Sequence, residues 1–235
     1  DTTTTLMWID GVNPLHVLHA YVAAGVALVL FGFIASRQQD AYQRIVKEAP
    51  VGIQVNWQKL AVVGLILALT IVTNYALDFP ALGVWVAILL GALLVKTPWQ
   101  ELKNATGGTI FLMGLVTCAS LMPVDELPPA SWLTTFFLGF VSAVFDNIPL
   151  TKLCLEQGGY DWGVLAYAVG FGGSMLWFGS SAGVALSNMY PESRSAVQWV
   201  RHGWHVPVAY VVSFFVMLAL VGWEPHAPHK ETFVE

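Results

Sequence analysis

Residues 141–151 read Val141-Ser142-Ala143-Val144-Phe145-Asp146-Asn147-Ile148-Pro149-Leu150-Thr151, and they set a carboxylate, an amide, a proline and a hydroxyl into an apolar run. An ionised side chain at membrane depth is costly, so it normally faces a cavity or a partner. Pro149 lacks an N–H and its ring clashes with the carbonyl four residues earlier, which predicts a helix break near 145–148. Freed backbone at that depth is tolerated only where protein or water covers it. The stretch therefore predicts a site, and the alternative is a kinked helix with Asp146 at an interface.

The composition is that of a polytopic, all-α membrane protein. Of the 235 residues, 56% are hydrophobic and only 11% are charged, and the mean hydropathy is +0.65. In soluble domains about a quarter of the residues are charged. The net charge of −5 is spread along the chain, which argues against a nucleic-acid partner and leaves the lipid bilayer as the expected surroundings.

The apolar segments predict about six membrane helices, one re-entrant hairpin and one broken helix. Uninterrupted spans are expected at 14–36, 57–77, 81–95, 107–124 and 206–221. The run 132–145 is too short to cross about 30 Å of hydrocarbon as a helix, so 131–157 is predicted to enter the membrane and return, turning at 146–149.

Small residues interrupt the next long apolar segment, 160–190, at Gly172-Gly173 and again at Gly179-Ser180-Ser181-Ala182-Gly183. This pattern predicts a broken helix with flexible backbone at mid-depth. The chain is then divided into 1–59, a first span with a cytoplasmic linker, and 60–235, a transport repeat that contains the hairpin and the broken helix.

The distribution of basic residues agrees with a hairpin that does not cross. Lys and Arg of short loops favour the cytoplasmic side. With a re-entrant hairpin only Lys152 and Lys230 fall outside, and the basic residues that gather inside are Arg37, Arg44, Lys47, Lys59, Lys96, Lys103, Arg194 and Arg201. The N-terminal end, the hairpin mouth and the C-terminal tail are therefore expected outside.

Two motifs resemble the ion transporter superfamily, and within it the NhaD-type sodium/proton antiporters. The run from Phe145 to Thr151 is similar to that family's hairpin tip, and the Gly-Ser run 179–183 is similar to its second broken helix. The resemblance implies one inverted repeat, the C-terminal half, of a transporter in a bacterial inner membrane. It also implies a homodimer and an N-terminal half on the same or a separate chain, because the sequence holds no second copy of the hairpin motif.

The same resemblance implies a transporter and not an enzyme, without a cofactor, in which Asp146 binds Na⁺ or Li⁺ and H⁺ in turn. Asn147 would supply an amide oxygen to the metal ion. Hydroxyls would come from Ser142, Thr151, Ser180 and Ser181, and close backbone approach or hinges from Pro149, Gly172, Gly173, Gly179 and Gly183.

Three other readings stay open at this point. Relatives in the superfamily carry anions such as dicarboxylates, citrate or arsenite, although a carboxylate at the tip favours a cation. A non-transporting membrane subunit is the second. The third is haem ligation by the pairs His16/His19 and His202/His205. Acidic residues in predicted loops, Asp161 among them, are expected to be solvated.

Overall fold

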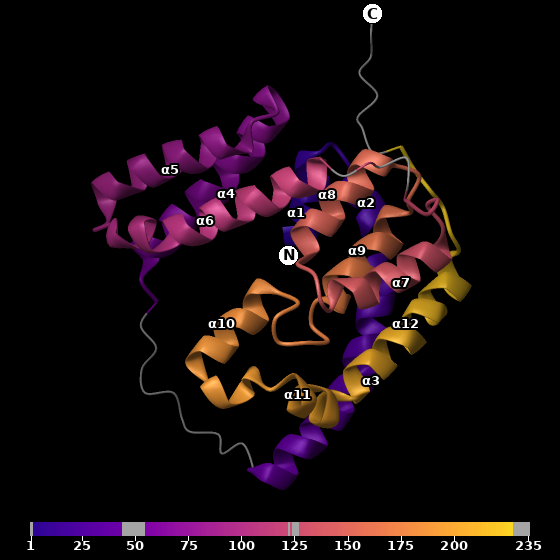
Figure 1. Ribbon diagram of the computed structural model, residues 1–235. Coiled ribbons are helices and arrows are strands. Elements are labelled where there is room, and N and C mark those ends of the chain that lie inside the picture. The colour runs from indigo at the N-terminus through magenta and orange to yellow at the C-terminus, as the bar shows by residue number, and fades with distance from the viewer. Residues whose placement is uncertain (1, 44–54, 122, 124–126, 228–235) are drawn as a thin grey trace, which may run out of the picture. The chain divides into compact units, whose positions relative to one another are not determined.

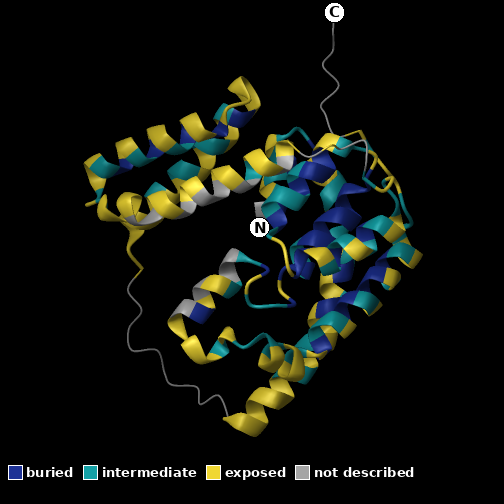
Figure 2. Cartoon of the chain, viewed as in Figure 1, coloured by how far each residue is buried: buried dark blue, intermediate teal, exposed yellow. Residues whose placement is uncertain are grey.

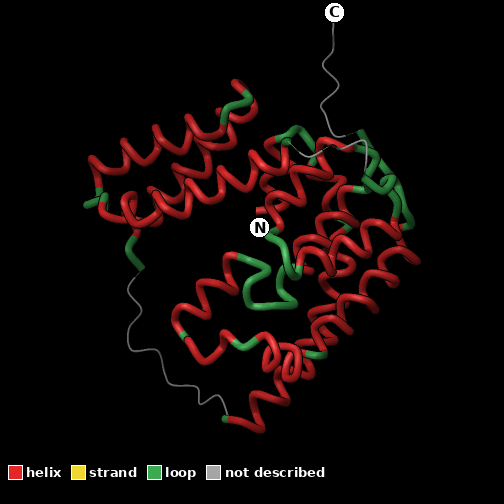
Figure 3. Tube along the Cα trace, viewed as in Figure 1, coloured by secondary structure: helices red, strands yellow, loops and turns green. Residues whose placement is uncertain are grey.

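The computed structural model describes residues 2–43, 55–121, 123 and 127–227, and every regular element in this part of the chain is a helix (Figures 1 and 3). The chain forms two compact units. Unit 1 comprises Asp1–Ile45 and Met113–Glu235, and unit 2 comprises Val46–Leu112. Helix α6 (Gln100–Ser120) begins in unit 2 and ends in unit 1. The all-helical prediction is confirmed for the described residues, whereas the division at residue 59 stays a prediction.

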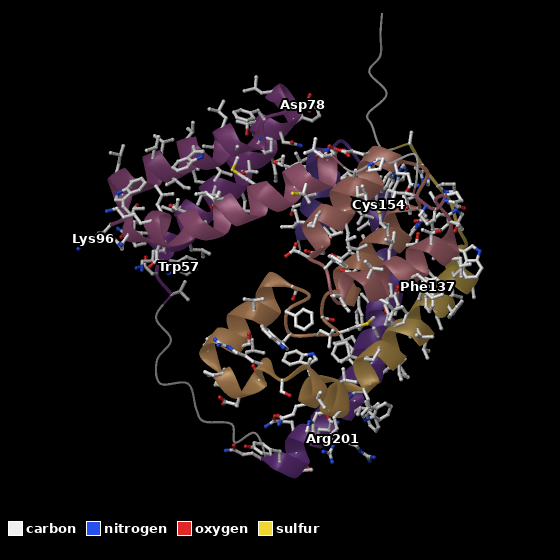
Figure 4. All side chains as sticks on the ribbon, viewed as in Figure 1. Trp57, Asp78, Lys96, Phe137, Cys154 and Arg201 are labelled. Carbon is white, nitrogen blue, oxygen red and sulfur yellow. The ribbon has the colours of Figure 1, made fainter. Side chains whose placement is uncertain are left out.

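Unit 2 contains a hairpin of two apolar helices, α4 (Trp57–Leu77) and α5 (Pro80–Leu94). The turn between them is tight because Asp78 adopts a left-handed conformation, with φ of 48°, and Pro80 starts α5. In Figure 4 the label of Asp78 lies at one end of this hairpin and those of Trp57 and Lys96 at the other. The buried face of α5 consists of small residues, Gly83, Ala87 and Gly91. Small side chains let two membrane helices pack closely.

The core of unit 1 is built around α9 (Trp162–Gly172), which is buried along nearly its whole length (Figure 2). Helices α1 (Thr2–Ile9), α3 (Ala20–Tyr42), α7 (Trp132–Ser142) and α12 (His205–Val221) pack against it. Tyr210 of α12 stacks on Tyr167 of α9 and donates a hydrogen bond of 2.8 Å to the carbonyl of Phe136 on α7. Aromatic packing and this hydrogen bond join three helices.

Helices α7 and α8 (Asn147–Gln157) form a helical hairpin. Each has 11 residues, a length of about 16 Å, which is half of a hydrocarbon core. The chain doubles back between them. The evidence is a 2.8 Å hydrogen bond that Gln157 Nε2, at the end of α8, donates to the carbonyl of Pro128, just before α7. Helix α7 starts at an N-cap, Ser131, whose side chain accepts from the backbone N–H of Thr134. The segment 131–157 is therefore not one continuous helix.

The turn of this hairpin lies at 143–146, earlier than the predicted 146–149. Asn147, Ile148 and Pro149 form the first turn of α8. Proline is tolerated there because the first helical N–H groups have no partner within the helix. The predicted helix break is present, a few residues earlier than expected, and the alternative of a continuous helix kinked at Pro149 is not: Pro149 lies in the first turn of α8, and Asp146 is the N-cap of that helix.

The apolar segment 160–190 is divided into α9 and α10 (Ser181–Met189), with an irregular stretch between them (Figure 3). After α10 follow a short 3₁₀ helix, η2 (Pro191–Arg194), and the amphipathic helix α11 (Ala196–Gly203). Helix α11 meets α12 at a bend of 58°. The predicted interruption of this segment is thus present as a non-helical stretch.

Two described helical stretches are long and apolar enough to cross a membrane, Pro14–Tyr42 and Trp57–Leu77, and α11 with α12 makes a third if the bent pair counts as one span. The first of them comprises α2 (Pro14–Val17) and α3 and continues beyond the predicted end at residue 36. Helices α5, α7 and α9 are apolar but shorter. The total of six membrane helices and the inverted repeat stay predictions.

Candidate functional site

Asp146 lies at the turn between α7 and α8 and is partly exposed. Its Oδ1 accepts a hydrogen bond of 2.9 Å from the backbone N–H of Ile148. This is an N-cap, which satisfies one of the first N–H groups of α8 and places a negative charge at the positive end of the helix dipole. The carboxylate thus has a structural contact of its own, and a function in transport has to be tested apart from it.

Two further predicted ligands, Asn147 and Thr151, lie on α8 and are buried. Thr151 donates a hydrogen bond of 2.7 Å from its hydroxyl to the backbone carbonyl of Asn147. The side chain of Asn147 donates from Nδ2 to Oγ1 of Thr3 on α1, at 3.1 Å. Asn147 is 7% exposed and Thr3 is fully buried. The side chain of Asn147 is therefore held by a helix that lies far away in the sequence.

The end of α7 is attached to the end of α9 by Ser142. Its hydroxyl donates a 2.8 Å hydrogen bond to the backbone carbonyl of Val169, and the side chain is fully buried. A buried hydroxyl that donates its hydrogen still has oxygen lone pairs. Ser142 thus connects the hairpin to the interrupted segment just before both are broken.

The predicted glycines allow the backbones of the two broken segments to touch. A methyl group at Gly172 would overlap the backbone of Gly139 on α7, and one at Gly179 would lie 2.6 Å from the carbonyl oxygen of Ala143. At Gly173 and Gly183 the obstructing atoms belong to the same irregular stretch, namely the carbonyls of Gly179 and Trp177. The turn of the hairpin and the interruption between α9 and α10 therefore lie against each other.

Ser180 and Ser181 have local positions at the start of α10. Ser180 is its N-cap, with Oγ accepting from the N–H of Gly183 at 3.2 Å. Ser181 is the first residue of α10, and its side chain lies outside the described part. Ser142 is thus joined to the second break by a hydrogen bond, whereas Asn147 and Thr151 make their contacts within α8 and with α1.

Four helix ends converge at these breaks. Helices α7 and α9 end there and α8 and α10 begin there. Ends contribute about half a unit of negative charge and beginnings about half a unit of positive charge. Asp146 caps α8 with a carboxylate and Ser180 caps α10 with a neutral hydroxyl. Within residues 139–151 and 170–187 Asp146 is also the only acidic residue. The region thus provides carbonyl oxygens and one carboxylate, which are ligands that hard cations prefer.

Asp161 differs from its prediction as a solvated loop charge, because it is 2% exposed. Oδ1 accepts from the N–H groups of Gly163 and Val164 and caps α9, and Oδ2 accepts from the N–H of Glu224 at 3.0 Å. The capping position directly before an apolar helix was visible in the sequence. The contact with Glu224 was not, because it depends on where the end of the described chain returns.

The histidine pairs lie at opposite ends of α3. His19 immediately precedes α3, and the carbonyl of His202 accepts a 3.1 Å hydrogen bond from Gln38 near the end of that helix. Residues 20 and 38 of a helix are about 27 Å apart, which is too far for one haem. His16 instead stacks on His226, with ring centroids 3.8 Å apart. Within the described residues no group of three His, Cys, Asp or Glu side chains is arranged to hold a metal ion.

A separate cavity of about 600 Å³ lies between α1, α2, α3 and α9 of unit 1. Its lining is mostly apolar, and the lining residues that carry a hydroxyl are Thr4, Thr5, Tyr21 and Tyr167. None of the predicted ion-binding residues contributes to it. The cavity is therefore distinct from the candidate site at the helix breaks.

These features define a class, the helical integral membrane proteins with interrupted helices at a shared polar region. The comparisons with known proteins are more specific. Over 231 residues the chain is 30% identical to sodium/proton antiporter 1 of Arabidopsis thaliana, covering 80% of the chain and 40% of that protein. Against the Na(+)/H(+) antiporter NhaD of Alkalimonas amylolytica it is 30% identical over 149 residues, or 57% of the chain and 30% of the relative. For NhaD of Vibrio cholerae the identity is 27% over 146 residues, 56% of the chain and 31% of the relative.

The chain is thus related to sodium/proton antiporters, NhaD proteins included, and the resemblance seen in its motifs is confirmed. These relatives are transporters and not enzymes. The chain spans less than half the length of each of the three. Neither a family model nor a solved structure gave a significant match.

Proposed function

We propose that this chain is part of a secondary transporter that moves Na⁺ or Li⁺ out in exchange for H⁺. The observation that supports this most directly is the contact between the two breaks, where Ala143 meets Gly179. Asp146 lies on the adjoining turn and is the only acidic residue within 139–151 and 170–187. The names of the relatives agree with this cargo, since they are sodium/proton antiporters. No resident cofactor is needed for such an exchange.

Competition for one carboxylate couples the two fluxes. A carboxylate that binds a cation must be deprotonated, so cation affinity falls as proton concentration rises. Asp146 binds either the cation or the proton. The binding site switches its access from one side of the membrane to the other only when Asp146 is in one of these two states. A proton entering from one side is thereby exchanged for a cation leaving from the other.

Oxygen atoms around Asp146 complete the proposed cation site. Ser142 and Thr151 use their hydrogens on backbone carbonyls, which leaves lone pairs on both hydroxyl oxygens for a cation. The amide oxygen of Asn147 and the Ser180 and Ser181 end of α10 are the other candidate donors. Gly172, Gly173, Gly179 and Gly183 allow the approach of the backbones.

The remaining ligands come from outside this chain. The chain matches 40% of the first relative, and we propose that an N-terminal half, on the same or a separate polypeptide, brings a second hairpin to the site. The complete protein is proposed to be a homodimer in the lipid bilayer of a bacterial inner membrane, with the C-terminal tail outside.

One observation favours a second candidate, an anion carrier. Helices α8 and α10 both start at the breaks, and helix N-termini attract anions. Asp146 offsets this at α8 through its charge, and for that reason we place the cation first. A non-transporting subunit is the remaining alternative, and it requires no charge at Asp146.

The substitution Asp146→Asn tests the proposal because Asn caps a helix about as well as Asp but has no charge. In everted vesicles with the full-length protein, Asp146→Asn is expected to abolish Na⁺-dependent proton movement while the protein accumulates normally. The matched control is Asp161→Asn, at the N-cap of α9, which is expected to retain antiport. Antiport with unchanged apparent Na⁺ affinity in Asp146→Asn removes the carboxylate from the mechanism, and a gain of anion transport supports the second candidate.

A further inference from the structure

Helix α11 lies at the level of a membrane surface. Gln38 Nε2, near the end of α3, donates a 3.1 Å hydrogen bond to the carbonyl of His202, and Figure 4 shows Arg201 of α11 beside this end of α3. Helix α3 begins at Ala20, and residues 20 and 38 of a helix are about 27 Å apart, close to the thickness of a hydrocarbon core. Helix α11 is also turned by 58° from α12. It therefore leaves the direction of the span where the hydrocarbon ends.

The residues of α11, with Trp204 after it, fall on three sides, because successive residues of a helix are rotated by about 100°. One side is apolar and consists of Val197, Val200 and Trp204, which are 77%, 53% and 50% exposed. A second side is partly buried and consists of Ala196, Trp199 and Gly203. The third is polar and exposed and consists of Gln198, Arg201 and His202. The described residues of the protein thus cover one side of α11 and leave an apolar and a polar side uncovered.

The uncovered apolar side matches the boundary between lipid headgroups and acyl chains. An amphipathic helix in the plane of a membrane buries its apolar face about 5–10 Å into this boundary and keeps its charged residues among the headgroups. Tryptophan is enriched at the same depth, and Trp204 lies where α11 meets α12. Lipid is therefore an occupant that fits both the position and the composition of α11.

The charges beside this apolar side are positive. Arg201 borders it on α11, and no acidic residue occurs within 193–223. On α3, Arg37 is exposed and its guanidinium lies 4.9 Å from the ring centre of Phe33, whereas Asp40 follows on the next turn, further from the span. Neither arginine has a carboxylate partner among the residues that the structure describes. Both guanidinium groups are therefore available to phosphate, which arginine binds with paired hydrogen bonds.

From these observations we propose that α11 and the end of α3 bind anionic phospholipid, with the apolar side of α11 at the acyl chains and Arg37 and Arg201 on the headgroup phosphates. The basic loops predict that this end faces the cytoplasm, where anionic lipids attract basic residues. The inference goes beyond the proposed transport and does not depend on the cation site. Because η2 joins α11 to α10, which starts at the second break, bound lipid anchors the chain that follows this break.

A fluorescent probe on single cysteines tests the position of the apolar side. The full-length protein, with native Cys118 and Cys154 replaced, is labelled with bimane at Val197→Cys and reconstituted in vesicles of phosphatidylcholine and phosphatidylglycerol. Lipids with a spin label near the headgroup are expected to quench most of the fluorescence. The matched control is Gln198→Cys, on the polar side of the same turn, which is expected to keep most of its fluorescence. If Val197→Cys does not accumulate, Val200→Cys on the same side takes its place.

The preference for anionic lipid is measured with the same probe at position 197. Quenching by spin-labelled phosphatidylglycerol is expected to be about fivefold stronger than by spin-labelled phosphatidylcholine, the size expected for one arginine near an anionic surface. Arg37→Gln/Arg201→Gln is expected to remove this preference, and Arg37→Lys/Arg201→Lys, which keeps both charges, is expected to retain it. Lys96→Gln removes an exposed positive charge in unit 2 and is expected to leave the preference unchanged.

Several results overturn the lipid site. Fluorescence at 197 that lipid does not quench means that another part of the protein, such as the proposed N-terminal half, covers α11. Equal quenching at 197 and 198 contradicts the orientation of the helix. A preference that is absent in the protein with both arginines, or that persists in Arg37→Gln/Arg201→Gln, rejects the headgroup contacts. Asp146→Asn is expected to leave the quenching unchanged, so that failure of the proposed cation site and failure of the lipid site are distinguishable.

Discussion

Helices α7 and α9 approach closely because Gly139 and Gly172 have no side chain where the helices meet. Gly139 and Gly172 face each other with backbone against backbone, and the hydroxyl of Tyr210 occupies the position where a methyl group of Gly139 would lie. Ser142 donates to Val169 one turn further along. A side chain at either glycine therefore forces apart the helices that bring the two breaks together.

Gly172→Ala is expected to impair transport because the new methyl group would overlap the backbone of Gly139, which cannot move aside as a flexible side chain could. Overpacking of this kind costs about 1–3 kcal/mol, so a lower melting temperature and a clear loss of antiport in vesicles are expected. Gly25→Ala on α3 is the matched control, since nothing lies within 4 Å of its added methyl group. The same substitution there is expected to be neutral or slightly stabilising. Equal effects at the two positions contradict the close approach.

At the scale of elements, Asp161 joins the start of α9 to the segment after α12. Its carboxylate caps α9 and also accepts from the N–H of Glu224. Two more hydrogen bonds follow, from Trp162 Nε1 to the carbonyl of His226 and from the N–H of His226 to the carbonyl of Tyr160. The ring of His226 is stacked on that of His16. Residues 222–227 are thus held across the beginning of α9.

Asp161→Ala is expected to loosen this segment and weaken α9. An N-cap contributes about 0.5–2 kcal/mol, and the N–H of Glu224 loses its acceptor as well. The measurement is hydrogen exchange by mass spectrometry, in which peptides covering 222–227 are expected to exchange faster than in the unsubstituted protein. Asp161→Asn keeps an oxygen acceptor and is expected to show a smaller change. If hydrogen exchange in 222–227 is unaltered in Asp161→Ala, Asp161 does not hold this segment against α9.

At the scale of the whole molecule, contacts within unit 1 hold both ends of the α7–α8 hairpin on one side, as a re-entrant hairpin requires. The mouth of the hairpin is closed by Gln157 and Pro128, and the segment at His226 lies beside Tyr160 and His16. The other end of α3 is next to α11, through Gln38 and His202. Positions 129, 156 and 224 are therefore expected on one side of the membrane and position 198 on the other.

Cysteine labelling of intact cells measures this arrangement. With native Cys118 and Cys154 replaced, single cysteines at Pro129, Glu156 and Glu224, all exposed, are expected to react with an impermeant reagent from outside. A cysteine at Gln198, also exposed, is expected to react only after permeabilisation. Opposite accessibility of positions 129 and 156 means that the segment crosses the membrane.

The amino-acid sequence was enough for the features that depend on local chemistry. Apolar runs predicted the helices. The short run 132–145 and the glycines after 171 predicted the two interrupted segments. The sequence was less reliable for the exact position of the turn: the break was expected near 145–148 and the turn of the hairpin at 146–149, but the turn lies at 143–146 and Pro149 is accommodated in the first turn of α8. Helix α1 was not expected at all, because threonine has a low helix propensity and tertiary packing stabilises the segment.

Some residues of the candidate site could be recognised from the sequence, whereas others depend on contacts in the tertiary structure. That Asp146 stands at a turn follows from sequence, because a carboxylate within an apolar run needs a helix end or a cavity. That Ala143 touches Gly179, that Ser142 bonds to Val169 and that Thr3 holds Asn147 follows only from tertiary structure. These contacts join residues distant in sequence, and the packing of α1, α7 and α9 selects them from the many pairs that hydrogen-bonding capacity alone allows.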